Sequence, residues 1–505
     1  MKQAPRPSPF RAPPAPALVL AIALPTLLVA SAPAHGRARH LERPVTSQGS
    51  IRFTVDTASF ASEGSETREE VYLQIPSTEL LFKPRGKDLI ARLEVAIAVR
   101  DTAGRAVVER KVPTELPVRS AAEAHDPAEV HVLQSEFSLA PGPYKVEVRV
   151  KDLERREMAV PLIIFLRRNA SGKASFPLEV PAIPDSGLSI SDIQFAREIQ
   201  DDGTGSPFRK GRYGITPCAD RVYGLLIPEL RLYFEISDRV HDESGAGELV
   251  QVAYEVRTMS DAMVAVRQEE LLLHEGTNWA RTAAFDLSRI PPGQYRAVVN
   301  VTKPSTAEET SASATFDVIW SAYSWNRKVD DLIAELAPVA TSDDQKRLKR
   351  LSSGERENFL AEFWKRLDPT PDTPRNEAFE EHHRRIRMAD RAFGVRVRGI
   401  LTDRGRIYVR YGQPDEISSG FATEEFIGSF LWNPKNEFDF SEEGRARGGY
   451  NFKDKAYETW TYDNRGEPLG ASARIGSGVG LRFVFVDVSG YGDYEMVHSS
   501  ESVEY

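Results

Sequence analysis

A repeated pattern of β-strands is the feature that most restricts the fold of this chain. The turn and strand that begin at Pro141-Gly142 recur at Pro292-Gly293, 151 positions later (292 minus 141). Val71-Tyr72 recurs as Val222-Tyr223 at the same offset. Two landmarks at one offset and in the same order indicate a duplicated unit. The alternative is coincidence, because short matches are common between β-rich segments.

Each copy is predicted to be a β-sandwich. Residues 144–150 alternate apolar and polar side chains with period two, which is typical of a strand with one wet face. Short strands separated by frequent turns predict two all-β, Ig-like sandwich domains, at residues 50–168 and 178–320. The Gly- and Pro-rich segment 203–217 is predicted to be a long loop inserted in the second copy.

After residue 320 the apolar side chains recur every three or four residues, which predicts helices. Ser352 and Glu355 form a capping-box pattern at one helix start. Thr373 followed by Pro374 has the pattern of another start. Strand patterns near the end of the chain add a small antiparallel sheet. Residues 321–505 are therefore predicted to form an α+β domain that begins with helices.

Residues 1–34 have the features of a cleavable signal peptide. Lys2, Arg6 and Arg11 precede an apolar core, and Ala32-Pro33-Ala34 is a small-residue cleavage site. The apolar core is shorter than the ~20 residues that a membrane span requires. We expect an exported protein, located in the periplasm, on the outer surface or outside the cell, with no transmembrane span after cleavage. An uncleaved N-terminal anchor is the alternative.

Charge and cysteine content exclude several functions. The net charge of −9 argues against general nucleic-acid binding, which requires a basic surface. A single cysteine, Cys218, excludes an internal disulfide framework and a cysteine-rich metal site. Between residues 327 and 410, however, Lys and Arg outnumber Asp and Glu by 19 to 15. This basic segment meets either an anionic surface or the acidic remainder of the protein.

The segment 399–416 is predicted to form a turn, a strand and a second turn. Gly405 tolerates the positive φ of a tight turn. Ile407 to Tyr411 are mostly β-branched or aromatic, which favours a partly buried strand. Pro414 ends the strand because it has no N–H to donate.

The same segment resembles the signature of the GWxTD domain family. The matching residues are Gly399-Ile400-Leu401-Thr402-Asp403-Arg404-Gly405 and, further on, Gly412-Gln413-Pro414-Asp415. Ile400 stands where the family has its tryptophan. Tyr457-Glu458-x-Trp460 resembles a terminal strand of the family. The resemblance covers residues 325–505 and implies an exported bacterial protein of unestablished function.

The candidate site residues are those of this motif: Gly399, Thr402, Asp403, Arg404, Gly405, Tyr408, Tyr411, Gly412, Pro414, Asp415, Tyr457 and Trp460. The aspartates either bind a cation or act as acid and base, or they cap turns by accepting backbone N–H groups. A five-residue strand would separate them by roughly 17 Å, which favours capping. The aromatic residues either form a binding face or pack against helices.

His382 and His383 are adjacent on a predicted helix, so their side chains point about 100° apart and do not easily share a metal ion. We expect both on a solvated, charged helix face.

We therefore expect a non-enzymatic interaction module of the envelope or the extracellular space. Its partner would be an envelope protein or a glycan. No catalytic residue, metal or cofactor is predicted. The alternative is a metal-dependent or acid/base hydrolase with its site around residues 399–416, which would use Asp403 or Asp415 with His382.

Overall fold

The described chain is mostly β-sheet, with several antiparallel sheets and few helices, which is consistent with β-sandwich domains. The structure, a computed structural model, describes residues 44–500 except 63, 159–166, 185–186, 239–246, 274–277, 326, 374, 396, 424–453 and 464–479. The expected signal peptide, residues 1–34, lies outside the described residues. No helix in the described part of the chain is long and apolar enough to cross a membrane.

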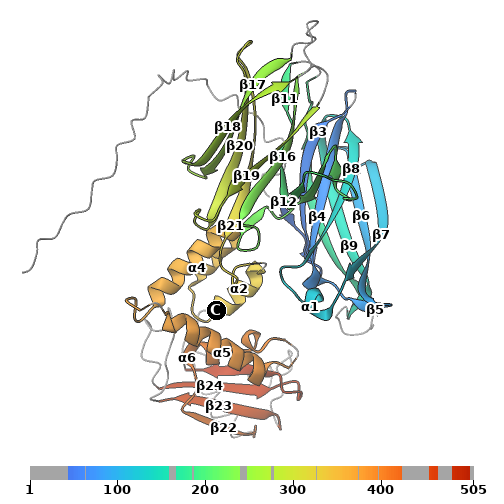
Figure 1. Ribbon diagram of the computed structural model, residues 1–505. Coiled ribbons are helices and arrows are strands. Elements are labelled where there is room, and N and C mark those ends of the chain that lie inside the picture. The colour runs from blue at the N-terminus through green and yellow to red at the C-terminus, as the bar shows by residue number, and fades with distance from the viewer. Residues whose placement is uncertain are drawn as a thin grey trace, which may run out of the picture. The chain divides into compact units, whose positions relative to one another are not determined.

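The first β region contains two sheets that share a core (Figure 1). One sheet has the order β1 (Val45–Thr46), β3 (Thr54–Ala61), β4 (Thr67–Pro76), β8 (Val130–Leu139). The other has the order β2 (Gln48–Gly49), β10 (Arg167–Val180), β9 (Gly142–Met158), β6 (Asp88–Arg100), β5 (Lys83–Arg85), and β7 (Ala106–Val118) also pairs with β6. The short elements η1 (Ser77–Glu79) and α1 (Ala121–Ala124) lie in the connections. The predicted alternation in β9 is confirmed, since Val146, Val148 and Val150 are buried and the residues between them are not.

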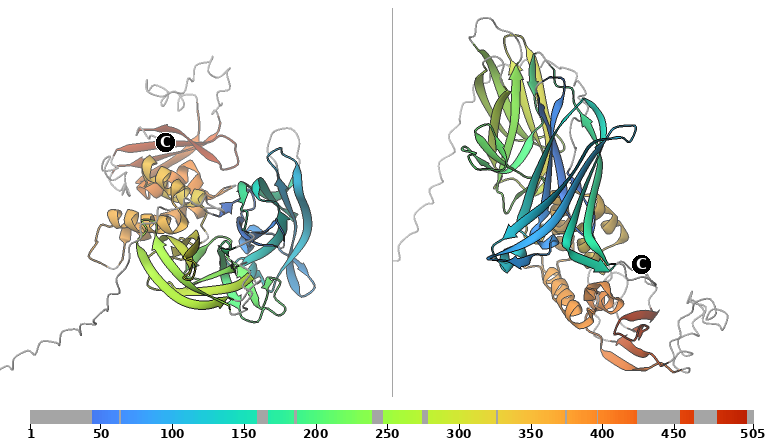
Figure 2. Two further views of the ribbon diagram at one scale, coloured as in Figure 1. Left: turned by 90° about the horizontal axis from the view of Figure 1, so that it is seen from above. Right: turned by 90° about the vertical axis from the view of Figure 1, so that its right-hand side faces the viewer.

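The second β region also contains two sheets around one core, seen as two layers in Figure 2. One sheet has the order β11 (Leu188–Ile190), β16 (Glu229–Asp238), β12 (Gln194–Gln200), β14 (Tyr213–Pro217), β13 (Arg209–Lys210), with β19 (Asn278–Asp286) paired to β16. The other has the order β15 (Val222–Gly224), β21 (Glu308–Ile319), β20 (Gly293–Lys303), β17 (Glu248–Thr258), β18 (Met263–Leu273).

The order of strand pairing is the same in both regions. The series β3-β4-β8 and β7-β6-β9-β10 of the first region corresponds to β12-β16-β19 and β18-β17-β20-β21 of the second. The turn at Pro141-Gly142 leads into β9 and the turn at Pro292-Gly293 leads into β20, which have equivalent places in this order. The repeated topology agrees with a duplicated unit, while the domain boundaries and the Ig-like assignment stay predictions.

Two details of the predicted repeat are wrong. Val71-Tyr72 lies in β4, whereas Val222-Tyr223 lies in β15, which pairs in parallel with β21. By pairing order the counterpart of β4 is β16, so two matching residue types were too few to define equivalence. The segment 203–217 is not only loop, because it contains β13 and β14. Its Gly203 is required by close backbone packing, since a Cβ there would lie 2.4 Å from the Tyr213 carbonyl oxygen.

The two β regions contact each other through one sheet of each. Phe60 and Tyr72 belong to a buried cluster with Tyr213 and Tyr233. Beside this cluster, the Arg221 guanidinium pairs with both carboxylate oxygens of Asp56, at 2.5 and 2.7 Å. Buried charges of this kind are paired because an isolated charge is expensive to desolvate.

Helices follow β21, as predicted: α2 (Val329–Leu336), α3 (Ser342–Arg350), α4 (Ser353–Leu367) and α5 (Glu377–Phe393). The capping box of Ser352 and Glu355 at the start of α4 is confirmed. The predicted start at Thr373 is wrong. The N-cap of α5 is Asn376, whose Oδ1 accepts the backbone N–H of Phe379 at 2.8 Å.

A four-stranded antiparallel sheet ends the described chain, with the order β22 (Glu416–Phe421), β23 (Ala456–Tyr462), β24 (Leu481–Asp487), β25 (Tyr494–Ser499). Before it come η2 (Gly399–Leu401) and α6 (Asp403–Tyr411), and α5 and α6 cover one face of the sheet (Figure 1). The predicted strand at residues 407–411 is therefore wrong. Packing overrides β-propensity here, since Ile407 and Tyr411, one helical turn apart, share a core with Trp460 and Phe483.

Candidate functional site

The GWxTD-like motif begins with a close contact between η2, α5 and α6. A Cβ on Gly399 would lie 1.9 Å from the carbonyl oxygen of Ala389 in α5. A Cβ on Gly405 would lie 1.8 Å from the carbonyl oxygen of Gly399. Both glycines are thus explained by backbone approach, and Gly405 is not in the positive-φ turn that the sequence predicted. Ile400, between them, is fully buried against Ile386, Ala389 and Val409.

Thr402 is the N-cap of α6. Its Oγ1 accepts the backbone N–H of Gly405 at 3.1 Å and donates to the carbonyl oxygen of Gly399 at 2.7 Å. The side chain therefore satisfies one of the N–H groups that a helix start leaves without an intrahelical partner.

The two motif aspartates hold backbone atoms at opposite ends of α6. Oδ2 of Asp403 accepts the backbone N–H of Met496 in β25 at 2.8 Å, and Oδ1 contacts the Arg406 guanidinium. Oδ2 of Asp415 accepts the backbone N–H of Asp463, which follows β23, at 2.7 Å. These contacts are those expected of carboxylates that position backbone. Asp403 fastens the start of α6 to β25, and Asp415 fastens the chain after α6 to the residue that follows β23.

Arg404 connects α6 to the sheet through a charged and aromatic contact. Its Nη1 donates to Oε1 of Glu458 at 3.0 Å, and its guanidinium lies 3.9 Å from the centre of the Tyr494 ring. Oε2 of the same Glu458 accepts the indole N–H of Trp460 at 3.0 Å. Arg404 and Trp460 are both buried, so this cluster stabilises the layer between helix and sheet.

The other end of α6 is fixed by Gly412 of the motif, by Arg385 of α5 and by Tyr462 of β23. Gly412 has a φ of 81° and carries the chain out of the helix. Arg385 of α5, which is 1% exposed, donates to the carbonyl oxygens of Val409 and Arg410 at 3.4 Å. The Tyr462 hydroxyl donates to the carbonyl oxygen of Gly412 at 3.0 Å. A cation at a helix C-terminus is favourable because the last carbonyl groups carry partial negative charge.

The aromatic residues of the candidate site do not form one open binding face. Tyr411 and Trp460 are buried in the core between α6 and the sheet, and Tyr408 packs against its edge. Tyr457 is half-buried in a separate apolar cluster with Ala422 and Val486. Pro414 is buried beside Gly412.

His382 is not on a solvated face, which corrects the prediction. It is fully buried, with its ring centre 4.9 Å from that of Trp364. Burial, followed by the effect of neighbouring His383, lowers the pKa of His382 to about 3. Its place in the apolar stripe with Phe379, Ile386 and Ala389 was a signal of this burial, because the spacings are three and four residues.

The arrangement does not gather the motif carboxylates with a histidine. Asp403 and Asp415 lie at opposite ends of a helix, and His382 packs against Trp364. Among the residues that the structure describes, no group of three or more His, Cys, Asp or Glu side chains could hold a metal ion.

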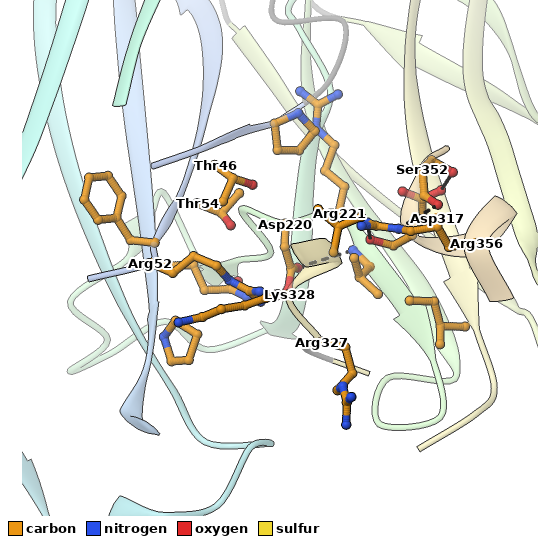
Figure 3. Close-up of a pocket in the computed structure, with 18 of the residues that line it drawn as sticks. Thr46, Arg52, Thr54, Asp220, Arg221, Asp317, Arg327, Lys328, Ser352 and Arg356 are labelled. Carbon is orange, nitrogen blue, oxygen red and sulfur yellow. Dashed lines mark hydrogen bonds between the residues drawn. The ribbon is translucent and has the colours of Figure 1, made fainter. Parts of the chain in front are cut away.

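A pocket of about 560 Å³ lies elsewhere, and no motif residue lines it. Its walls come from residues 44–54 before and within β3, from Asp220 to Val222, from the end of β21, and from the starts of α2 and α4 (Figure 3). This junction pocket combines segments that are distant in the sequence, and no local motif predicted it.

The charged residues of the junction pocket are mostly basic. Its lining includes five basic side chains, Arg52, Arg221, Arg327, Lys328 and Arg356, and three acidic ones, Asp220, Asp317 and Asp330. Lys328 pairs with Glu79 of the first β region at 2.9 Å. At this position the basic segment 327–410 therefore meets the more acidic remainder of the protein, which was one of its two expected partners.

Comparisons with known proteins identify one domain. The family model of the GWxTD domain matches residues 301–467, which confirms the resemblance seen in the sequence. A search of curated proteins gives no match.

Solved structures share little with this chain. This chain is 10% identical to the protein pT26-6p, with a TM-score of 0.19, and the match covers 70% of this chain and 80% of pT26-6p. It is 8% identical to red sea bream transglutaminase, with a TM-score of 0.15, covering 54% of this chain and 32% of that one. It is 12% identical to a DUF3823 family protein from Bacteroides ovatus, with a TM-score of 0.17, covering 48% of this chain and 96% of that one. At these TM-scores the likeness supports no conclusion about function.

Proposed function

This chain carries a GWxTD domain at residues 301–467, and we propose that it is an exported, non-enzymatic binding protein. In this proposal the GWxTD motif holds the C-terminal fold together, and a ligand binds in the junction pocket. The envelope or extracellular location, and an envelope protein or glycan as the source of the ligand, belong to the same proposal. So does the finer layout of two Ig-like sandwich domains followed by an α+β domain.

The observation that supports the proposal is the separation of motif and pocket. A catalytic acid or base has to reach a substrate proton at about 3 Å. The carboxylates of Asp403 and Asp415 instead accept backbone N–H groups of the protein. The pocket has about 560 Å³ and no motif side chain, and small-molecule sites typically measure ~300–1,000 Å³. No observation in the described residues favours the alternative, a hydrolase at residues 399–416.

The test is a thermal-shift screen of the full-length protein against neutral, cationic and anionic small molecules. We expect at least one class to raise the melting temperature of the wild type. Thr46→Trp, which places a large ring at the exposed wall of the pocket, should abolish that shift. Thr114→Trp on β7, which does not line the pocket, is the matched control and should retain it.

The proposal fails if no class of compound stabilises the wild type. It also fails if Thr46→Trp leaves the shift unchanged, because the ligand would then bind outside the pocket. Steady conversion of any stabilising compound into a product would contradict a non-enzymatic role.

A further inference from the structure

We propose that the junction pocket binds a small hydroxylated ligand through an anionic group, a carboxylate or a phosphate, held between Arg52 and Arg356. This inference rests on the proposed function, since it concerns the same pocket, and it adds the chemical class of the ligand.

The two arginines reach the pocket from opposite walls (Figure 3). Arg52 precedes β3 in the first β region, and Arg356 lies in the first turn of α4. Arg356 donates to Oγ of Ser353 at 2.9 Å and to the carbonyl oxygen of Ser352 at 3.3 Å. These contacts hold the guanidinium in place with neutral acceptors. Within the described ranges no ion pair of Arg356 is found.

Three other basic side chains of the lining form ion pairs with carboxylates outside it, and Arg52 also has acidic neighbours, namely Glu79, Asp220 and Asp331. Arg221 pairs with Asp56 at 2.5 Å, Lys328 with Glu79 at 2.9 Å, and Arg327 with Glu335 at 2.5 Å. These three positive charges are therefore largely neutralised by the protein. Arg356 forms no such ion pair within the described residues, so its guanidinium is the best placed to bind an external anion.

Two of the acidic side chains of the lining accept hydrogen bonds from neutral donors. Oδ2 of Asp220 accepts from the Gln74 side-chain amide at 2.6 Å. Oδ1 of Asp317 accepts from the Ser352 hydroxyl at 2.6 Å and from the Gly354 backbone N–H at 3.3 Å. These carboxylates are thus held in place by fixed protein donors.

Both arginines of the proposed site are largely desolvated. Burial is the main factor that lowers the pKa of Arg52, and it also lowers the pKa of Arg356. Nearby charges act on both groups: Asp317 raises the pKa of Arg356 and Arg52 lowers it, while Glu79, Asp220 and Asp331 raise the pKa of Arg52. Two desolvated positive charges facing one cavity repel, and an oxyanion between them would accept hydrogen bonds from both planar guanidinium forks.

Beside apolar residues such as Phe53 and Phe316, the remainder of the lining includes groups that are suited to ligand hydroxyls. It presents hydroxyl and amide side chains, namely Thr46, Ser47, Gln48, Thr54, Gln294 and Ser324. Such groups donate hydrogen bonds to ligand hydroxyls and also accept hydrogen bonds from them. A sugar acid and a sugar phosphate combine this polar body with the required anionic group.

The test is isothermal titration calorimetry on the full-length protein with glucuronate, glucose 6-phosphate, inorganic phosphate and neutral glucose. We expect at least one of the first two to bind and glucose not to bind. Arg356→Gln should weaken binding at least tenfold, and Arg356→Lys, which keeps the charge, should recover part of it. Arg350→Gln is the matched control, because Arg350 is exposed on α3 and does not line the pocket.

The outcomes separate the two proposals. If a neutral or cationic compound stabilises the wild type but not Thr46→Trp, and none of the anions binds, the anion inference is refuted and the pocket stays a binding site. If an anion binds equally well to wild type and Arg356→Gln, the inference is refuted as well. Binding of inorganic phosphate alone shows that the anionic group suffices and contradicts the role given to the hydroxylated body.

Discussion

The backbone N–H of Met496 donates to Oδ2 of Asp403 across 2.8 Å, which fastens the start of α6 to β25. Asp403 is therefore a structural clamp between the first turn of a helix and a sheet edge. A carboxylate in the first turn is also favoured by the partial positive charge of a helix N-terminus.

The Asp403→Ala variant should lose about 1–3 kcal/mol of unfolding free energy, because the N–H of Met496 loses its charged acceptor. Urea denaturation followed by circular dichroism measures this. Asp343→Ala is the control, since Asp343 also lies in the first turn of its helix, α3, but its side chain is 93% exposed. Its loss should stay within about 0.5 kcal/mol. Equal losses in the two variants would contradict the clamp.

Gly405→Ala should destabilise the protein by about 3 kcal/mol, because the new Cβ would lie 1.8 Å from the Gly399 carbonyl oxygen. Helix propensity alone predicts the opposite, a gain of about 1 kcal/mol in a helix. The sign of the change in urea midpoint therefore decides between local propensity and tertiary contact. Gly104→Ala is the comparison, since it meets open space at a φ of 80° and should lose only about 1–2 kcal/mol.

His382 should make the protein sensitive to acid. Its folded pKa is about 3, against an ordinary value near 6.5, so the unfolded chain binds a proton that the folded chain does not. Above pH 6.5 His382 is neutral in both states and does not lower the free energy of unfolding. Between pH 6.5 and 3 it binds a proton only in the unfolded chain, which lowers the free energy of unfolding by about 2 kcal/mol at pH 5. His382→Leu should reduce the difference in stability between pH 7.5 and pH 5. His125→Gln, at an exposed histidine, should leave it unchanged.

Arg221→Met should lose about 3–5 kcal/mol, because it leaves the buried carboxylate of Asp56 without its partner. The double variant with Asp56→Asn should lose less, since the uncompensated charge is then gone. A double-mutant cycle in urea measures the coupling. Arg105→Met, which breaks the exposed pair with Asp101, should change stability by less than about 1 kcal/mol. If Arg221→Met also lost less than about 1 kcal/mol of unfolding free energy, the buried pair would contribute little to stability.

The predictable parts of this fold depend on local patterns. The alternation of Val146, Val148 and Val150 and the capping box of Ser352 and Glu355 each lie within a few residues of sequence, so a periodicity or a cap rule detects them. The repeat was detectable for the same reason, because the turns that open β9 and β20 are nearly identical in sequence.

The parts that could not be predicted depend on distant residues. Ile407 to Tyr411 favour a strand by composition, and only the approach of the Gly399 and Gly405 backbones and the core with Phe483 explain the helix. Arg52 and Arg356 line one pocket although some three hundred residues separate them in the chain. Of the candidate site, the sequence identified the motif, and one of its two alternatives had the aspartates accept backbone N–H groups. The structure places these N–H groups at Met496 and Asp463 rather than in adjacent turns, and the sequence did not predict the pocket.

Ile400 is fully buried among Ile386, Ala389 and Val409, at the position where the GWxTD signature has tryptophan. An indole occupies far more volume than a sec-butyl group, so a lineage that acquires tryptophan here has to shrink or shift those three neighbours. Positions 386, 389, 400 and 409 are therefore expected to have changed together during divergence, as one coevolving set.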